Sequence, residues 1–177
     1  EDDVSLSDLR KEYDAVYVAI GAHTDKKIGI EGEDAKGVIS AVEMLRSIGD
    51  DNPPDFTGKT VVVVGGGNVA MDCTRSAIRL GAKKVGIAYR RRQEDMTALP
   101  EEIEGAIAEG AELYSLKAPH KIEADENGQV TAIWVEPQII GTIDAWGRAR
   151  PVRAAVELKR IPCDIVVVAI GQGIESR

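Results

Sequence analysis

The sequence contains few of the residues that metal and thiol redox chemistry require. It holds two cysteines and two histidines in 177 residues. Cys73 and Cys163 stand far apart and form no C-x-x-C pair, which excludes a local redox dithiol and a zinc knuckle. We therefore expect both cysteines to be reduced residues of the core. Nothing places a general base beside His23 or His120, so we expect neither histidine to act in catalysis.

Several longer patterns are also absent. The sequence shows no signal peptide and no apolar run approaching about 18 residues, so we expect a cytoplasmic protein with no membrane partner. Its formal net charge of −8 argues against nucleic acid as a partner, because an acidic surface repels a phosphate backbone. None of the tyrosines begins a Tyr-x-x-x-Lys pair, which removes the short-chain dehydrogenases. No Ser-His-Asp or metal-ligand constellation stands out either.

The most informative stretch that is present runs from Thr60 to Asp72 and reads TVVVVGGGNVAMD. Its four consecutive valines predict a parallel strand that is buried on both faces. Gly65, Gly67 and Ala70 then match the G-x-G-x-x-G/A spacing of a dinucleotide-binding turn, which needs glycine at the tight turn and beneath the pyrophosphate. The first amides of the following helix and its positive amino end favour a diphosphate. The alternative interpretation is a glycine-rich turn of another α/β protein, such as a methyl-donor enzyme.

The end of the next strand indicates which nucleotide would bind. In an NAD site, an acidic residue about 20 positions after the glycines accepts hydrogen bonds from the ribose hydroxyls. Here the apolar strand Val85–Tyr89 ends in the run Arg90–Arg92 instead. Guanidinium groups match phosphate geometry with paired donors, so Arg90 and Arg91 predict recognition of the 2′-phosphate of NADP. Arg92 is equally well placed to point into water, and an arginine run can also be a solvated surface.

One strand pattern occurs twice in the chain. Residues 14–21 read DAVYVAIG, and residues 164–171 read DIVVVAIG. Each is an apolar strand of the kind that returns to a sheet beneath a nucleotide site. Two such strands indicate two dinucleotide-type domains, yet the sequence holds a single glycine-rich turn, so we expect the other turn to lie upstream of Glu1 in a larger parent protein. We accordingly assign residues 1–37 to the tail of the other domain with a hinge, and residues 38–177 to a nucleotide-binding domain.

The remaining patterns predict the fold class, which is α/β with a Rossmann-like parallel sheet, helices on both faces and an accessory antiparallel β-ribbon. One helix is expected around Val42–Ile48 and another after Pro100, followed by a further sheet strand at Ala111–Leu116. The expected ribbon strands are Lys121–Asp125, Val130–Glu136 and Pro151–Arg160. We expect Trp134 to cover the sheet and Trp146 to lie in a loop or at a partner surface, with stacking on an adenine as the alternative for either.

Several segments together carry a resemblance to a known family. They read YDAVYVAIGA, IEGEDAKGVISAVEML, VVVVGGGNVAMDCTRSAIRLGAKKV, AYRRRQEDMTALPEEI and DIVVVAIGQ. The chain resembles, over roughly Tyr13–Gln172, the NADPH-binding domain of the glutamate synthase small (β) subunit and its relatives, which include the matching segment of dihydropyrimidine dehydrogenase and the NADPH:ferredoxin-type flavoprotein subunits. The resemblance implies an FAD domain that is interrupted by an inserted NADPH domain. It also implies that hydride passes from nicotinamide to flavin, and electrons then pass through iron–sulfur centres to a distant partner.

The resemblance further implies which residues meet the cofactor. The expected cofactor-binding residues are Gly65, Gly66, Gly67, Asn68, Val69 and Ala70 at the turn, Arg90 and Arg91 at the 2′-phosphate, and Ala169, Ile170 and Gly171 beside the nicotinamide half. Thr97 departs from the family, because some relatives place a further arginine there, and this weakens the expected phosphate contact. The cluster cysteines and the second FAD motif of the family lie outside residues 1–177. Neither an iron–sulfur centre nor a complete FAD site is therefore credited to this chain.

We expect the chain to bind NADPH and to position it for hydride transfer to a flavin, the FAD of the parent protein, that is housed mostly elsewhere. No catalytic residue and no metal ligand are expected, and the isolated chain should bind NADPH without turnover. The expected partners are NADP(H), the remainder of the parent flavoprotein, and an iron–sulfur or large synthase subunit. Two alternatives stay open: a non-catalytic NADP(H)-binding regulatory module and a stand-alone NADP-dependent dehydrogenase.

Overall fold

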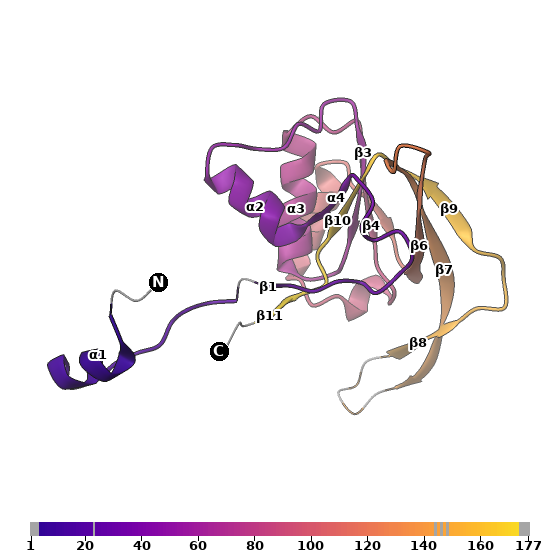
Figure 1. Ribbon diagram of the computed structural model, residues 1–177. Helices are drawn as coiled ribbons and strands as arrows, with labels where there is room; N and C mark the ends of the chain where they lie inside the picture. Colours follow the sequence, from indigo (N-terminus) through magenta and orange to yellow (C-terminus); the bar gives the residue numbers. More distant parts are fainter. Residues whose placement is uncertain (1–3, 23, 144, 146, 148, 174–177) are drawn as a thin grey trace.

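The computed structural model describes residues 4–22, 24–143, 145, 147 and 149–173. At its centre is a parallel sheet with the strand order β2-β10-β3-β4-β5 (Figure 1). Its strands are β2 (Val38–Ser40), β3 (Thr60–Val64), β4 (Lys84–Ala88), β5 (Glu112–Tyr114) and β10 (Ile165–Val168). From β3 the chain continues to β4 and β5 on one side, whereas β10 and β2 lie on the other side. β3 is therefore the strand at which the order of the sheet reverses.

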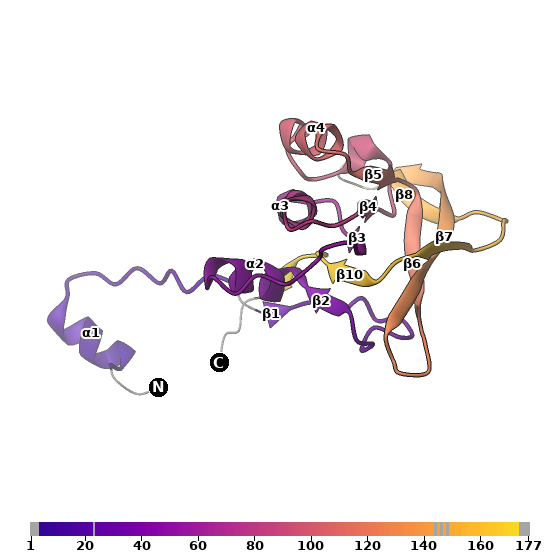
Figure 2. The same cartoon turned by 90° about the horizontal axis from the view of Figure 1, so that it is seen from above.

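Helices cover one face of this sheet (Figure 2). They are α2 (Ala41–Gly49), α3 (Asn68–Arg79) and α4 (Pro100–Ala108), and they confirm the predicted helices. Val61 and Val63 of β3 pack on this face in a core that includes Met71 and Cys73 of α3 and Ile103 of α4. The buried residues of α3 recur at the spacing that keeps them on one side of a helix.

Antiparallel strands cover the other face. The strands of this ribbon are β6 (Lys117–Ala124), β7 (Val130–Ile143), β8 (Ala149–Arg153) and β9 (Lys159–Pro162), of which β6, β7 and β9 contribute to the core on this face. Val62 and Val64 pack there against Ile122, Ile133 and Val135. The predicted α/β Rossmann-like class and the accessory ribbon are confirmed, but the prediction of helices on both faces is wrong. The inward residues of β6 and β7 already form an apolar layer, and this layer buries the second face of the valine strand without a helix.

The ribbon differs in detail from the prediction. β6 and β7 pair antiparallel as predicted, and both are longer than predicted. The segment predicted as one strand, Pro151–Arg160, contributes to two strands, β8 and β9, which both pair with β7. Arg153 lies opposite Gln138 and Lys159 lies opposite Val135, so the residues between Arg153 and Lys159 outnumber those facing them. The surplus residues must leave the ladder, which divides the segment into two strands.

The segment before β2 does not form the strand that its sequence predicts. Residues 4–22 lead away from the sheet through α1 (Leu6–Glu12), and residues 14–21 form no strand (Figure 1). Tyr17 is 93% exposed, whereas the matching strand β10 is paired on both sides. The two sequences are nearly alike, so the difference lies in the surroundings of each segment and not in its own residues. The chain then forms β1 (Thr24–Asp25), which pairs antiparallel with β11 (Gln172–Gly173).

The isolated aromatic and histidine residues lie away from the glycine-rich turn or outside the described part. Trp134 is half-buried on β7, where its Nε1 donates to Glu123 at 2.8 Å. His120 lies on β6, and its Nδ1 is 4.0 Å from a carboxylate oxygen of Glu136. His23 and Trp146 lie outside the described residues. None of the described helices combines the length and the apolarity that crossing a membrane requires.

A candidate nucleotide-binding cleft

A cleft of about 620 Å³ opens at the carboxyl ends of β3, β4 and β10. It lies at the strand where the order of the sheet reverses, which is the position at which open α/β sheets bind ligands. Its lining includes every predicted site residue except Ala70. Segments that are more than 100 residues apart in the sequence, at Gly65 and Ala169, therefore meet in one cleft.

The first glycine of the turn is required by the neighbouring strand. Gly65 has φ +151°, a backbone conformation that L side chains rarely adopt. A Cβ atom at this position would overlap the carbonyl oxygen of Ala169. The backbone here is fixed from both sides, because the Gly65 amide donates to Ala88 at 3.2 Å and the Ala169 amide donates to Val64 at 2.8 Å. The turn is therefore in direct backbone contact with the ends of β4 and β10.

Gly66 and Gly67 suit the turn for reasons that differ from the reason for Gly65. A Cβ atom on Gly66 would lie 2.5 Å from the ring of Tyr89, so the ring packs directly against the turn. Gly67 is the N-cap of α3 and makes no side-chain hydrogen bond to the helix. Because this cap has no side chain, none stands between the amino end of the helix and the cleft. A bound anion would meet the positive end of α3 directly.

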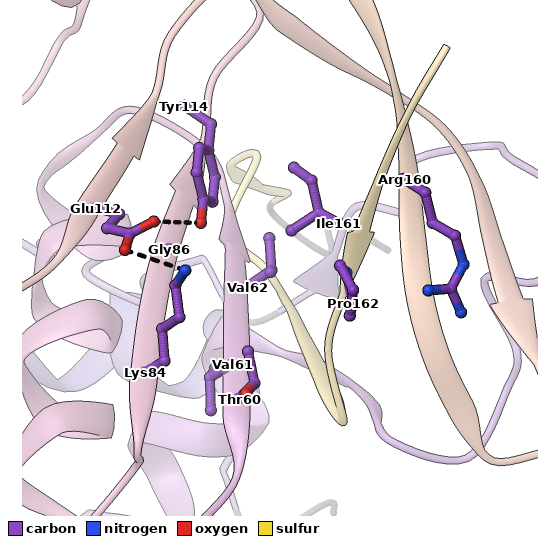
Figure 3. A pocket seen from close by; sticks show the side chains of 10 residues that line it. All are labelled: Thr60, Val61, Val62, Lys84, Gly86, Glu112, Tyr114, Arg160, Ile161 and Pro162. Atoms are coloured by element: carbon purple, nitrogen blue, oxygen red, sulfur yellow. Dashed lines mark hydrogen bonds and ion pairs between the residues drawn. The ribbon is translucent and has the colours of Figure 1, made fainter.

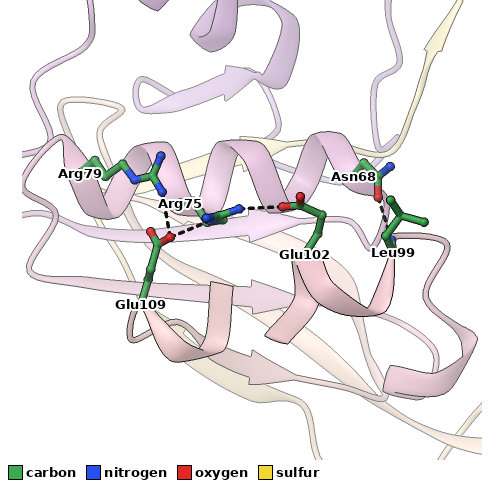
Figure 4. A network of polar contacts seen from close by, with 6 residues as sticks. All are labelled: Asn68, Arg75, Arg79, Leu99, Glu102 and Glu109. Atoms are coloured by element: carbon green, nitrogen blue, oxygen red, sulfur yellow. Dashed lines mark hydrogen bonds and ion pairs between the residues drawn. The ribbon is translucent and has the colours of Figure 1, made fainter. Parts of the chain in front are cut away.

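The residues after the glycines divide between cleft and core. Asn68 and Val69 line the cleft, and the Asn68 Oδ1 atom accepts a hydrogen bond from the Leu99 amide at 2.8 Å (Figure 4). Ala70 is fully buried, with 0% exposure, and packs in the core between helix and sheet. The structure therefore does not bring Ala70 to the cleft. Its small side chain instead serves the close approach of α3 to the sheet.

The three arginines of the run Arg90–Arg92 do not all reach the cleft. Arg90 and Arg91 line the cleft. Arg92 instead donates from Nε to Asp95 at 2.8 Å and from Nη1 to Glu94 at 2.7 Å. The Arg92 guanidinium is therefore paired with two carboxylates and is not simply directed into water. The Arg92 guanidinium lowers the pKa of the Asp95 carboxyl, and its hydrogen bonds to Asp95 raise the pKa of Arg92.

Several cleft residues were not among the predicted site residues. Thr97 lines the cleft, and it is the position at which the resemblance places a further arginine in some relatives. Tyr89, which the sequence interpretation missed, lines the cleft next to the predicted Arg90, so its position carried a signal. Ile28 and Pro119 also line it. These two come from the segments before β2 and in β6, where no local pattern marks a nucleotide site. Their placement depends on how the ribbon and the amino-terminal segment pack against the sheet.

The loop before α4 is held beside the turn by ion pairs between the helices (Figure 4). Arg75 of α3 donates to Glu102 at 2.7 Å and to Glu109 at 2.8 Å. Arg79 also donates to Glu109 at 2.8 Å. Together with the contact between Asn68 and the Leu99 amide, these pairs fix α4 along the length of α3.

A second cavity of about 340 Å³ lies at the amino ends of β3, β4 and β5 (Figure 3). The cations among its lining residues are Lys84, paired with Glu112 at 3.0 Å, and Arg160, paired with Glu123 at 2.6 Å. Both are therefore already neutralised by carboxylates. The cavity also lies at the opposite end of the strands from the glycine-rich turn, and it is not a phosphate site of the kind that the turn predicts.

The thiols take no part in the cleft. Cys73 and Cys163 are both free and buried. Burial raises the pKa of each thiol to about 12, so both remain protonated at neutral pH. Their prediction as reduced core residues is confirmed. Within the described ranges, no three side chains of His, Cys, Asp or Glu gather into a group that would hold a metal ion.

The sheet, the glycine-rich turn and the helix after it define the class of protein, an α/β domain with a Rossmann-like fold. The chain belongs to the pyridine nucleotide-disulphide oxidoreductase family, whose family model matches residues 2–177.

Curated relatives match nearly the whole chain. The NADP(+)-dependent formate dehydrogenase subunit beta of Moorella thermoacetica is 42% identical over 98% of this chain and 25% of its own length. The NADPH-Fe(3+) oxidoreductase subunit beta of Geobacter sulfurreducens is 41% identical over 96% of this chain and 26% of its own length. The NADPH glutamate synthase small chain of Escherichia coli K12 is 38% identical over 96% of this chain and 38% of its own length. The resemblance to the glutamate synthase small-subunit family is confirmed, and the chain spans about a quarter to two-fifths of these relatives.

Solved structures share the fold. Mycobacterium tuberculosis FprA in complex with NADPH superposes with a TM-score of 0.75 at 22% identity, over 96% of this chain and 52% of that chain. The thioredoxin reductase of T. acidophilum superposes with a TM-score of 0.62 at 20% identity, over 84% of this chain and 41% of that chain. At such identities the likeness shows the fold alone.

Proposed function

We propose that this chain binds NADPH and positions it for hydride transfer to a flavin that is housed mostly outside residues 1–177. The observation that carries the proposal is the single cleft in which the glycine-rich turn, the amino end of α3 and the side chains of Arg90 and Arg91 converge. A turn with no room for side chains fits a pyrophosphate, and guanidinium groups at the end of β4 fit a 2′-phosphate. The names of the relatives, which include NADPH and NADP(+), agree with this choice of coenzyme.

Each part of the cleft has its own task in this proposal. The turn Gly65–Gly67 and the amides of Asn68 and Val69 hold the pyrophosphate, and Arg90 and Arg91 bind the 2′-phosphate. Residues 169–171 flank the nicotinamide half. The coenzyme supplies the hydride, and this chain contributes alignment of the nicotinamide and exclusion of water. Because the chain has a net charge of −8, its affinity for phosphate must come from these local groups.

The pairing of β1 with β11 supports a division of the chain. Thr24 lies opposite Gly173, so the chain enters and leaves the nucleotide-binding body side by side (Figure 1). We propose that residues 38–177 form an NAD(P)H-binding domain inserted into an FAD domain, and that residues 1–37 are the tail of that domain and a hinge. FAD would be held mostly by the remainder of the parent flavoprotein. Two of the relatives are named as beta subunits and one as a small chain, which supports a further subunit as a partner. We propose that this partner is an iron–sulfur or large synthase subunit.

Calorimetric titration of the chain with NADPH and with NADH tests the proposal. We expect NADPH to bind, with higher affinity than NADH, and no turnover when an artificial electron acceptor is added. Absence of binding, or equal affinities for the two coenzymes, would contradict the proposal. Turnover of a simple alcohol or ketone without flavin would favour a stand-alone dehydrogenase instead.

A further inference from the structure

Behind the two cleft arginines, the side chain of Arg92 is held by carboxylates rather than directed at the cleft. Its Nε donates to Asp95 Oδ2 at 2.8 Å, and its Nη2 donates to Asp95 Oδ1 at 3.1 Å. Its Nη1 lies 2.7 Å from a carboxylate oxygen of Glu94. The two carboxylates differ in burial, because the side chain of Asp95 is 6% exposed and that of Glu94 is 65% exposed. The paired hydrogen bonds to Asp95 therefore form a clamp whose carboxylate is shielded from water, whereas the Arg92 side chain is 33% exposed.

The clamp is connected to the glycine-rich turn. Asp95 ends the short 3-10 helix η1 (Gln93–Asp95), and its carbonyl oxygen accepts a hydrogen bond from the Tyr89 hydroxyl at 2.8 Å. The ring of Tyr89 in turn lies against Gly66. The carbonyl oxygen of Gly66 accepts hydrogen bonds from the amides of Thr97 and Ala98, each at 3.0 Å. The segment that follows the arginines is thus fastened to the turn through a side chain and through its backbone.

We propose that Arg92 and Asp95 are positioning residues that set the preference for NADPH over NADH. This inference rests on the proposed function. The clamp holds the segment from Arg90 to Ala98 against the turn, so that Arg90 and Arg91 keep a fixed distance from the pyrophosphate site. Held in this way, the two cleft arginines lose less conformational freedom when a 2′-phosphate binds. Arg92 and Asp95 themselves do not touch the coenzyme.

The substitution Asp95→Asn separates positioning from simple electrostatics by the sign of its effect. Removing a carboxylate near Arg91 makes the surroundings more positive, and this change alone would tighten the binding of a 2′-phosphate. Loss of the clamp has the opposite effect, because the segment that carries the arginines is released. We therefore expect the Asp95→Asn chain to bind NADPH about three- to tenfold more weakly, with its affinity for NADH unchanged.

Glu94→Gln is the matched control, since it removes the same charge from the same arginine at an exposed position. We expect it to leave NADPH affinity within about twofold of the wild type or to tighten it. Arg92→Lys keeps the positive charge but loses the paired geometry, and we expect it to weaken NADPH binding as Asp95→Asn does. Thermal unfolding of each chain shows whether it is folded, and Arg92→Lys carries the test if Asp95→Asn does not fold.

The outcomes separate this inference from the proposed function. Unchanged or tighter NADPH binding by both clamp variants, beside a wild type that prefers NADPH, overturns the positioning role and leaves the proposed function intact. Equal weakening of NADPH and NADH also overturns it, because a merely structural clamp would affect both coenzymes. A wild-type chain with no preference for NADPH contradicts the proposed function itself.

Discussion

A Cβ atom on Gly65 would overlap the carbonyl oxygen of Ala169, so the turn after β3 and the end of β10 meet backbone to backbone. Gly65 also has φ +151°, where a side chain is strained in any case. The contact joins the two segments that we expect to flank the two halves of the coenzyme. The absence of a side chain at this one position therefore serves the fold and the cleft together.

Gly65→Ala should lower the free energy of unfolding by about 2 kcal/mol or more, because overlap adds to backbone strain. Gly58→Ala is a suitable control, since Gly58 also has a positive φ, +71°, but a Cβ atom there meets nothing within 4 Å. Its cost should be about 1 kcal/mol from conformation alone. Urea unfolding measures both values. Equal losses in the two variants would show that the contact with Ala169 has no energetic weight.

Arg90→Ala combined with Arg91→Ala should reduce NADPH affinity on the order of 30- to 100-fold and leave NADH affinity nearly unchanged, because only NADPH carries the 2′-phosphate. Lys59→Ala combined with Lys83→Ala removes the same charge from exposed positions at the amino ends of β3 and β4. This control should change neither affinity by more than about twofold. Calorimetric titration compares the variants. Equal losses for NADPH and NADH in the arginine variant would show that these arginines are misassigned.

Stability in acid should depend on Glu123, which joins β6 to β7 and β9. Hydrogen bonds from Arg160, and then from Trp134, lower the pKa of this carboxyl from 4.5 to about 2. A folded-state pKa below the unfolded value contributes stability above pH 4.5 that is lost as the pH falls toward 2. The wild-type chain should therefore lose more stability between pH 7 and pH 3 than Glu123→Gln does. Urea unfolding at both pH values tests this, and parallel losses in the two chains would contradict it.

The copy of the repeated pattern at residues 14–21, which forms no strand, should make the chain associate. Residues 13–20 expose Tyr13, Tyr17, Val18 and Ile20, and an exposed segment of high strand propensity is a template for another chain. Sedimentation at increasing concentration should show dimers, and Tyr17→Asp with Val18→Asp should reduce them. A monodisperse wild-type monomer with rapid amide exchange throughout residues 13–20 would contradict this expectation.

The predictable parts of the structure are those that a local pattern determines. The run from Thr60 to Asp72 forms β3, the turn and the start of α3 as predicted, because its valines are buried in the sheet and a side chain at Gly65 or Gly66 would overlap a neighbour. The sequence did not predict that the ribbon covers the sheet face opposite the helices. The alternation of apolar and polar residues in β6 and β7 indicates a ribbon, but it does not indicate what the ribbon packs on. Residues 14–21 and 164–171 also show the limit of a local pattern, because residues 14–21 form no strand and residues 165–168 form β10. Nearly equal sequences differ in structure because strand formation depends on neighbours elsewhere in the chain.

The candidate site likewise contains residues that a local pattern predicts and residues that only tertiary packing places there. Gly65, Gly67, Arg90 and Arg91 follow from motif and strand position, and all four line the cleft. The carboxylate three positions after Arg92 was visible in the sequence, but its burial was not, and burial is what makes the pair a clamp. Ile28 and Pro119 reach the cleft through tertiary packing alone, so no local signal indicated them.

The most direct test of the account is a crystal structure of this chain with NADPH. We expect the coenzyme to lie across Gly65–Gly67, with its 2′-phosphate within hydrogen-bonding distance of Arg90 and Arg91 and its nicotinamide half beside residues 169–171. A coenzyme bound elsewhere, or bound here with its 2′-phosphate directed away from both arginines, would contradict the central claim.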